Sequence, residues 1–358
     1  MTLAAVRAAD VLRAARARNA SDVHLGAGER PALRVDGRLV AVDGASFDEA
    51  GVRAFLATVL DAGALARLDA RGYADAAAPR AADGAPYRVH AYRAAGGVRA
   101  AIRLLAPGVP AFETLGLPAS VAALGQRATG LVLFTGPTGS GKTTALAALV
   151  DRVNRRAERV IVTIEEPIEY VHAPLRSVIA QCEVGHDVDD HAEALRGALR
   201  ADPDIIVVGE MRDRETIAAA LTAAETGHLV LATLHTSDAA QTVDRIVDAF
   251  TAEAQPQVRA QLAAVLGGVV SLRLVPRREG AGRCAAAEVL IATDAVRALI
   301  RDGKTHQLRN VIVTGRAAGM QTLEAHLSEL VVRGDLAPAD ARAAAMRPDD
   351  VRTAERAP

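Results

Sequence analysis

The sequence has very few lysines, aromatic residues and cysteines. Of its 42 basic residues only Lys142 and Lys304 are lysines, and the remaining 40 are arginines. Aromatic residues make up 3% of the 358 residues and Trp is missing, which leaves few rings on which nucleic-acid bases could stack. Cys182 and Cys284 are far apart and form no CxxC pair, so neither a cysteine-rich zinc site nor a disulfide framework is expected.

The sequence also lacks an excess of charge and a long apolar run. Its 43 acidic and 42 basic residues nearly cancel, so no global field attracts nucleic acid or an anionic membrane. No apolar run approaches the roughly 20 residues that span a bilayer, and charges recur too often near residue 1 for a signal-peptide core. We therefore expect a soluble, cytoplasmic protein, long enough for two domains.

The strongest positive feature is a phosphate-binding loop. Residues 136–143 read GPTGSGKT and match G-x-x-x-x-G-K-[ST], between the apolar run 131–134 and the helical pattern of 145–150. The glycines let successive backbone N–H groups surround a phosphate at a helix N-terminus. The residues expected to bind nucleotide are Gly136, Pro137, Thr138, Gly139, Ser140, Gly141, Lys142 and Thr143.

Lys142 and Thr143 have specific expected roles in this loop. Lys142 would reach the β- and γ-phosphates, and the Thr143 hydroxyl would bind Mg²⁺. A chain that otherwise uses arginine keeps a lysine here, because a compact ammonium group fits inside a backbone cradle and a planar guanidinium does not. The sequence therefore predicts an enzyme that binds ATP with Mg²⁺.

Residues 1–105 are predicted to form a small α/β domain, 106–116 a linker, and 117–358 a second domain. The expected elements of the first domain are a helix with Leu3, Val6, Val11 and Leu12 inward, strands at 21–25 and 32–35 with a turn at Asp36-Gly37, a helix over 49–60, and a hairpin of 87–92 and 98–103 through Gly96-Gly97. Arg88 and Arg103 of that hairpin either lie on solvated faces or project toward a bound nucleotide.

Strands and helices alternate from residue 130 onward, which predicts a parallel-rich sheet covered by helices. A short helix is expected around 118–124, before the first of these strands. The predicted strands are 131–134, 160–164, 205–208, 229–233 and 269–274, and C-terminal helices are expected over about 293–346.

Carboxylates follow two of these strands. Glu165 and Glu166 lie at the end of 160–164, where open parallel sheets bind ligands, and they would hold Mg²⁺ through water or orient the attacking water. Glu210 follows the buried strand 205–208 and is the candidate general base for in-line attack on the γ-phosphate. The alternatives are a solvated acidic turn at 165–169 and a helix-capping role for Glu210.

Two histidines flank the strand at 229–233. They are seven positions apart, so they would face opposite sides of an unbroken strand and would not share a metal. His235 at the C-terminal end is the candidate sensor of the γ-phosphate, and His228 is expected to be structural or to make an inter-domain contact. The alternative for each is an ordinary core or surface histidine.

The phosphate-binding loop, the two acidic segments and the histidine-flanked strand together resemble the motifs of the secretion-type ATPases of type IV pili and type II secretion. They most closely resemble those of the pilus retraction ATPase (PilT) family. The matching segments are a Walker A motif at Gly136–Thr144, an Asp box at 164–169, an atypical Walker B motif at 202–213, a His box at 226–236, and the N-domain segments 20–25 and 34–37. The resemblance covers nearly the whole chain and adds Thr144 to the nucleotide-binding residues.

The resemblance implies a fold, an assembly and an activity. The fold would be a PAS-like α/β N-domain followed by a RecA-like P-loop ATPase domain, and the assembly a homohexamer. The activity would be ATP hydrolysis that drives pilus retraction and twitching motility, with Mg²⁺ on Thr143 and, through water, on Glu165. The implied partners are an inner-membrane pilus platform protein and a sister retraction ATPase, with membrane association only through partners and no nucleic acid.

Residues 295–302 separate the retraction family from its relatives. They read AVRALIRD and resemble the family's AIRNLIRE signature, although Ala298 and Asp302 depart from it, as Glu166 departs from the Asp of the Asp box. An ordinary amphipathic helix is the alternative for this segment. At the level of function, the alternatives are an accessory retraction ATPase, a type II secretion or pilus assembly ATPase, a non-motor regulatory partner and, more distantly, a nucleic-acid translocase.

Overall fold

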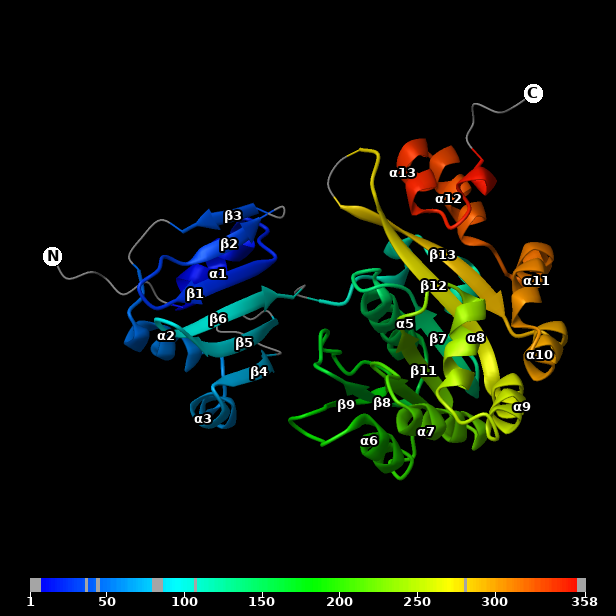
Figure 1. Cartoon of the computed structure of the whole chain (residues 1–358), viewed down its shortest axis with the longest axis horizontal. Coiled ribbons are helices and arrows are strands. Elements are labelled where there is room, and N and C mark those ends of the chain that lie inside the picture. The colour runs from blue at the N-terminus through cyan, green and yellow to red at the C-terminus, as the bar shows by residue number, and fades with distance from the viewer. Residues whose placement is uncertain are drawn as a thin grey trace. The chain divides into compact units, whose positions relative to one another are not determined.

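The computed structural model describes residues 8–35, 38–42, 46–78, 86–105, 108–279 and 282–352. The chain forms two compact units (Figure 1). Unit 1 comprises the residues up to Val109 together with Pro167–Val171, and unit 2 comprises Pro110–Glu166 and the residues from His172 onward. No helix among the described residues is long and apolar enough to cross a membrane.

Unit 1 is built on a six-stranded sheet in the order β3-β2-β1-β6-β5-β4, and the neighbouring strands are antiparallel. Its strands are β1 (Asp22–Gly26), β2 (Ala32–Val35), β3 (Arg38–Ala41), β4 (Tyr73–Ala78), β5 (Tyr87–Ala94) and β6 (Gly97–Leu104), and its helices are α1 (Ala8–Ala17), α2 (Glu49–Leu56) and α3 (Ala62–Arg71). The core contains Leu12, Leu33, Leu56, Leu68 and Ile102.

The predicted strands and hairpin of unit 1 are confirmed, while one helix is shorter than expected. The helix predicted over 49–60 ends at Leu56, because Asp61 then caps a separate helix, α3, by accepting from the N–H of Ala64. The predicted contributions of Leu3 and Val6 and the turn at Asp36-Gly37 lie outside the described residues, as do Ala106 and Pro107 in the predicted linker.

Unit 2 is built on a seven-stranded sheet in the order β13-β12-β7-β11-β10-β8-β9. Its strands are β7 (Gly130–Thr135), β8 (Val160–Glu165), β9 (Val178–Glu183), β10 (Ile205–Val208), β11 (Leu229–Leu234), β12 (Leu266–Pro276) and β13 (Arg283–Ile291). Each neighbouring pair is parallel except β12 and β13. The five predicted strands and the parallel-rich α/β class are confirmed, whereas β9 and β13 were not predicted.

Helices connect and cover this sheet. They are α4 (Ala119–Leu124), α5 (Lys142–Arg156), α6 (His191–Ala198), α7 (Arg214–Glu225), α8 (Ala239–Asp248), α9 (Gln255–Val265), α10 (Asp294–Arg301), α11 (Leu308–Thr314), α12 (Leu323–Val332) and α13 (Pro338–Ala344). The short helix predicted around 118–124 is α4. The predicted C-terminal helical region contains α10 to α13.

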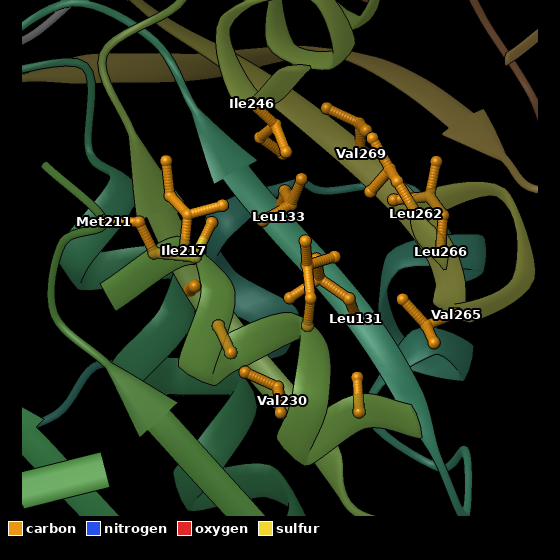
Figure 2. Packing of buried hydrophobic residues seen from close by; sticks show 14 of the residues in the cluster. Leu131, Leu133, Met211, Ile217, Val230, Ile246, Leu262, Val265, Leu266 and Val269 are labelled. Carbon is orange, nitrogen blue, oxygen red and sulfur yellow. The ribbon is translucent and has the colours of Figure 1, made fainter. Parts of the chain in front are cut away.

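The central strands are buried on both faces. Leu131 and Leu133 of β7 pack in one cluster with Ile246, Leu262 and Val269 (Figure 2). The alternate β7 residues, Val132 and Phe134, are also fully buried and face the other side of the sheet. A strand buried on both faces reads as a continuous apolar run, which is why β7, β10 and β11 are recognisable in the sequence.

The parallel topology brings the predicted site residues to one edge of the sheet. The phosphate-binding loop follows β7, Glu165 ends β8, Glu210 comes two residues after β10, and His235 directly follows β11. Because these strands are parallel and adjacent in the order β7-β11-β10-β8, their carboxyl ends lie side by side. Residues separated by up to 99 positions are therefore available to one site.

Candidate active site

The phosphate-binding loop has the backbone that its glycines permit. Gly136, Gly139 and Gly141 have φ values of 138°, 77° and 91°, in the region that residues with a Cβ rarely enter. Gly141 is the N-cap of α5, so the loop leads directly into a helix N-terminus. Ser140 Oγ is buried there and has no hydrogen-bond partner among the described residues, which leaves a polar group for a phosphate.

Lys142 lies inside this loop. It is 8% exposed, and its Nζ donates to the carbonyl oxygens of Gly136 at 2.7 Å and Pro137 at 3.1 Å. The only other lysine, Lys304, is exposed and pairs with Asp302 at 3.0 Å. The lysine predicted to bind phosphate is thus fixed by the loop that would hold the nucleotide.

His235 joins Lys142 to Glu210. Its Nδ1 is 3.4 Å from Lys142 Nζ and its Nε2 is 3.2 Å from Glu210 Oε1. Because an ammonium group can only donate, Nδ1 of a neutral ring is the acceptor, and the ring hydrogen is then on Nε2, from which it is donated to Glu210. Three of the predicted site residues, from three different strand ends, are therefore in direct contact.

Arg212 connects the carboxylates of Glu210 and Glu166, which follow two different strands. Its Nε donates to Glu210 Oε2 at 2.8 Å and its Nη1 to Glu166 Oε2 at 3.3 Å. The hydrogen bond to Glu210 raises the pKa of Arg212 above its ordinary value. The guanidinium therefore keeps Glu166 and Glu210 close to each other, although 43 residues separate them in the sequence.

Glu165 is oriented by two neighbours. Its Oε1 accepts from Thr163 Oγ1 at 2.7 Å and from Gln181 Nε2 at 3.1 Å. Gln181 is on β9, the strand beside β8, and its Oε1 accepts from the backbone N–H of His172 at 2.9 Å. Gln181 thus links the Glu165 carboxylate to the segment that follows the acidic turn.

His228 lies at the opposite end of β11 from His235. Its Nδ1 is 3.0 Å from the carbonyl oxygen of Ala223 and 3.3 Å from Thr226 Oγ1. It therefore contacts the end of α7 and not the phosphate-binding loop.

Arg88 and Arg103 are register partners on β5 and β6 of unit 1. Arg103 Nε donates to Asp22 Oδ1 at 3.0 Å, and Arg88 Nη2 donates to Glu169 Oε1 at 3.2 Å. All four residues belong to unit 1. Both arginines therefore have carboxylate partners within unit 1, and the exposed fraction of the side chain is 34% for Arg88 and 62% for Arg103.

Sequence reasoning did not single out Arg212 or Gln181 as site residues. The signal for Arg212 was its place two residues after Glu210, because both then follow β10. Gln181 had no such signal, since it is on an unpredicted strand and 16 residues away from its carboxylate partner.

The oxygen donors at this edge fit Mg²⁺. No group of three or more His, Cys, Asp or Glu side chains suited to a metal exists in the described part of the chain. Mg²⁺ commonly takes only one or two protein oxygens, with the rest of its shell from water and substrate phosphates. The Thr143 hydroxyl and the Glu165 carboxylate are donors of that kind.

Comparisons with known proteins identify the family to which the chain belongs. The family model for type II/IV secretion system proteins matches residues 7–347. The type IV pilus retraction ATPase PilT of Pseudomonas aeruginosa is 43% identical over 92% of this chain and 96% of its own. The protein YggR of Escherichia coli is 46% identical over 89% of this chain and 96% of its own.

A solved structure matches in both fold and length. The crystal structure of the pilus retraction motor PilT with bound ADP superposes with a TM-score of 0.88 at 40% identity, covering 96% of this chain and 98% of that one. The fold class and the ATPase class predicted from the motifs are confirmed. The chain therefore belongs to the type II/IV secretion system protein family and is a PilT-like P-loop ATPase.

Proposed function

We propose that this chain is a hexameric motor that hydrolyses ATP to retract type IV pili. The observation that carries the proposal is the contact chain Lys142–His235–Glu210, which joins the phosphate-binding loop to a candidate base at one sheet edge. The match to PilT over nearly the full length of both chains supports the direction of action. A match of 48% identity to a twitching motility protein of Neisseria gonorrhoeae agrees with it.

Nucleotide binding is assigned to the loop and its helix. Backbone N–H groups of Gly136–Thr144 and the N-terminus of α5 hold the phosphates. Lys142 exchanges its carbonyl partners for β- and γ-phosphate oxygens. Thr143 directly and Glu165 through water are the residues that would hold Mg²⁺, and the ion would neutralise charge on the phosphates.

Hydrolysis is assigned to the residues around His235. Glu210 takes a proton from the water that attacks the γ-phosphate in line. His235 reports the presence of the γ-phosphate through its shared contacts with Lys142 and Glu210. Arg212 holds Glu210 in place, and Glu166, which shares that arginine, orders the surrounding water.

The motor is proposed to be a ring of six copies. Residues 1–105 act as a PAS-like N-domain, 106–116 as a linker with its hinge at 106–110, and 117–358 as the RecA-like ATPase domain. Arg88 and Arg103 complete the nucleotide sites of the assembled ring, and phosphate release drives rotation about the hinge. The ring works at the cytoplasmic side of the inner membrane on a pilus platform protein.

The test combines one substitution with two assays. Glu210→Gln is expected to bind ATP with about unchanged affinity and to lose roughly 10²–10⁴-fold in kcat, the range for removing a general base. Cells that carry it should assemble pili that fail to shorten. Glu215→Gln is the matched control, because Glu215 is exposed and forms an ion pair with the neighbouring Arg214 at 3.0 Å.

Two results would contradict the proposal at different points. A Glu210→Gln protein with wild-type turnover would refute the base assignment. Loss of surface pili in the deletion strain would refute retraction and favour an assembly ATPase.

An accessory retraction ATPase is the second candidate. The type IV pilus ATPase PilU of Pseudomonas aeruginosa is 37% identical over 93% of this chain. Retraction by this chain in cells that lack every other retraction ATPase would exclude the accessory role.

A further inference from the structure

A row of buried polar side chains crosses unit 2 at the level of the phosphate-binding loop. Thr135 of β7, Ser271 of β12 and Glu288 of β13 are paired in register, and register partners share a face of the sheet. They are 0%, 3% and 4% exposed. Thr135 Oγ1 donates to Ser271 Oγ at 2.8 Å, and Thr135 directly precedes Gly136, so the row begins at the loop.

Glu288 at the far end of this row caps a helix in another part of the chain. Its Oε1 accepts from the backbone N–H of Ala239, the first residue of α8, at 3.0 Å. That N–H has no partner within the helix, and the Asp238 side chain instead caps the N–H of Gln241. A carboxylate at a helix N-terminus is stabilised by the helix dipole. Glu288 thus fixes the point at which α8 begins.

The anchored segment is the one that carries His235. Residues 235–238 connect the end of β11 to the start of α8. The segment is closed by a hydrogen bond between Thr236 Oγ1 and Thr242 Oγ1 at 2.7 Å and by one from Thr242 Oγ1 to the carbonyl oxygen of Asp238 at 2.7 Å. With β11 fixing one end and Glu288 the other, the place of the imidazole depends on both anchors.

The charges around Glu288 determine how strongly it holds α8. Asp238 and Glu324 face it with negative charge, and Arg309 faces it with positive charge. Burial raises its pKa to about 7, so its charge changes near neutral pH. An ionised carboxylate accepts a stronger hydrogen bond from an N–H than a neutral one. The hold on α8 therefore tightens as pH rises through neutrality.

We propose that Glu288 is a positioning residue of the ATPase site, which holds His235 opposite Lys142 and Glu210 by anchoring the start of α8. The inference rests on the proposed ATPase function, to which it adds a residue from the antiparallel strand β13. Glu288 is on β13, which β12 separates from β7 and the loop that follows it, so it acts through the 235–238 segment.

The test measures ATP turnover of the full chain between pH 6 and pH 8.5 for Glu288→Gln and Glu288→Ala. In the wild type, kcat is expected to rise with an inflection near pH 7. Glu288→Gln, whose amide oxygen still accepts from Ala239, should keep activity near the acidic limit and lose that inflection. Glu288→Ala should lose about tenfold in kcat, because the reacting groups are misplaced, with KM for ATP changed less than about twofold.

Asp151→Asn is the matched control. Asp151 is another buried carboxylate of unit 2, on α5, and it pairs with Arg155 at 2.7 Å. Its variant should keep the wild-type pH profile. Wild-type kcat and pH profile in both Glu288 variants would overturn the proposal, and so would an inflection that Glu288→Gln retains.

Amide hydrogen exchange separates this inference from the proposed function. Glu288→Ala should speed exchange in residues 239–242 with or without ATP, and unchanged exchange there would overturn the anchor. A wild-type chain that hydrolyses no ATP would refute the proposed function, and the exchange result would still decide whether Glu288 anchors α8.

Discussion

Gly136 shows how narrow the choice of residue is at the phosphate-binding loop. A Cβ at this position would be 2.5 Å from the Leu272 carbonyl oxygen and 2.5 Å from Ser140 Oγ. The first of these atoms is backbone of the neighbouring strand β12 and cannot move without disturbing the sheet. Only a hydrogen fits between the end of β7 and that strand.

Gly136→Ala is accordingly expected to abolish ATP binding and to destabilise unit 2. Gly139→Ala is the matched control, because Gly139 also has a positive φ of 77° but the methyl group of an alanine there would meet no described atom within 4 Å. Gly139→Ala should lower the stability of unit 2 only by the strain of a left-handed alanine, about 1–2 kcal/mol. Fluorescent-nucleotide titration and urea unfolding of both variants check this, and equal losses in the two would contradict the steric argument.

Glu288 also makes a prediction about stability. Its pKa is about 7 in the fold and 4.5 for the ordinary side chain, so the native state binds more protons than the unfolded state between these values. Stability therefore falls as pH rises through this window. Relative to wild type, Glu288→Gln should gain roughly 3 kcal/mol between pH 4.5 and pH 8.

Urea unfolding of wild type and variant at several pH values measures that difference. Comparing the two proteins at each pH cancels the other titrating groups. A stability difference that stays constant from pH 4.5 to pH 8 would show that Glu288 has an ordinary pKa.

Most single site residues were accessible from the sequence because each follows a recognisable strand. Lys142, Glu210 and His235 were located in this way, and the structure brings them into contact. Arg212 was passed over because its role depends on reaching Glu166 on another strand. Arg88 contacts Glu169 and Arg103 contacts Asp22. Both contacts depend on tertiary packing, which residue spacing does not predict.

At the scale of elements, the strands found from sequence are those buried on both faces. β10 reads IIVV and β11 reads LVLATL, and every residue in both is buried. β9 has no fully buried residue, and β13 begins with the alanine-rich run RCAAAE. Alanine is compatible with helix or core and gives no clear period, so these edge strands were not predicted, and neither were the strand β4 and the helix α3 of unit 1.

The unpredicted strand β9 has a functional consequence. Removing the amide in Gln181→Ala would leave Glu165 with one fewer donor and the N–H of His172 without its acceptor. We expect kcat to fall roughly 10–100-fold, as for other residues that orient a ligand, with ATP affinity nearly unchanged.

Gln181→Glu distinguishes orientation from packing, because it keeps the volume and the acceptor for His172 but removes the donor to Glu165. It should be as slow as Gln181→Ala. Wild-type turnover by either variant would show that the Gln181 amide is not needed to orient Glu165.

At the scale of the whole molecule, the proposed ring predicts its own mass. Light scattering behind size exclusion should give six times the mass of one chain when nucleotide is present. Glu210→Gln should assemble equally well with ATP, because the substitution affects cleavage and not binding. A single-chain mass at all protein and nucleotide concentrations would contradict the motor.

The order of the strands in each sheet could not be predicted from the sequence. Alternating strands and helices predicted a parallel-rich sheet, but nothing in the residues placed β7 between β12 and β11 or paired β12 with β13 in reverse. These pairings depend on long-range packing. They also place Glu288 within reach of α8, which is why its role emerges only from the fold.

The two lysines differ in how exposed their ε-amino groups are, which makes the chain suited to labelling with amine-specific reagents. Lys142 is enclosed by carbonyl oxygens, whereas Lys304 is open to solvent beside Asp302. An acylating reagent therefore meets just two ε-amino groups, one shielded and one accessible. Mass spectrometry of the modified peptides would then report any change in Lys142 acylation when nucleotide replaces these carbonyl partners, with Lys304 as a reference within the same molecule.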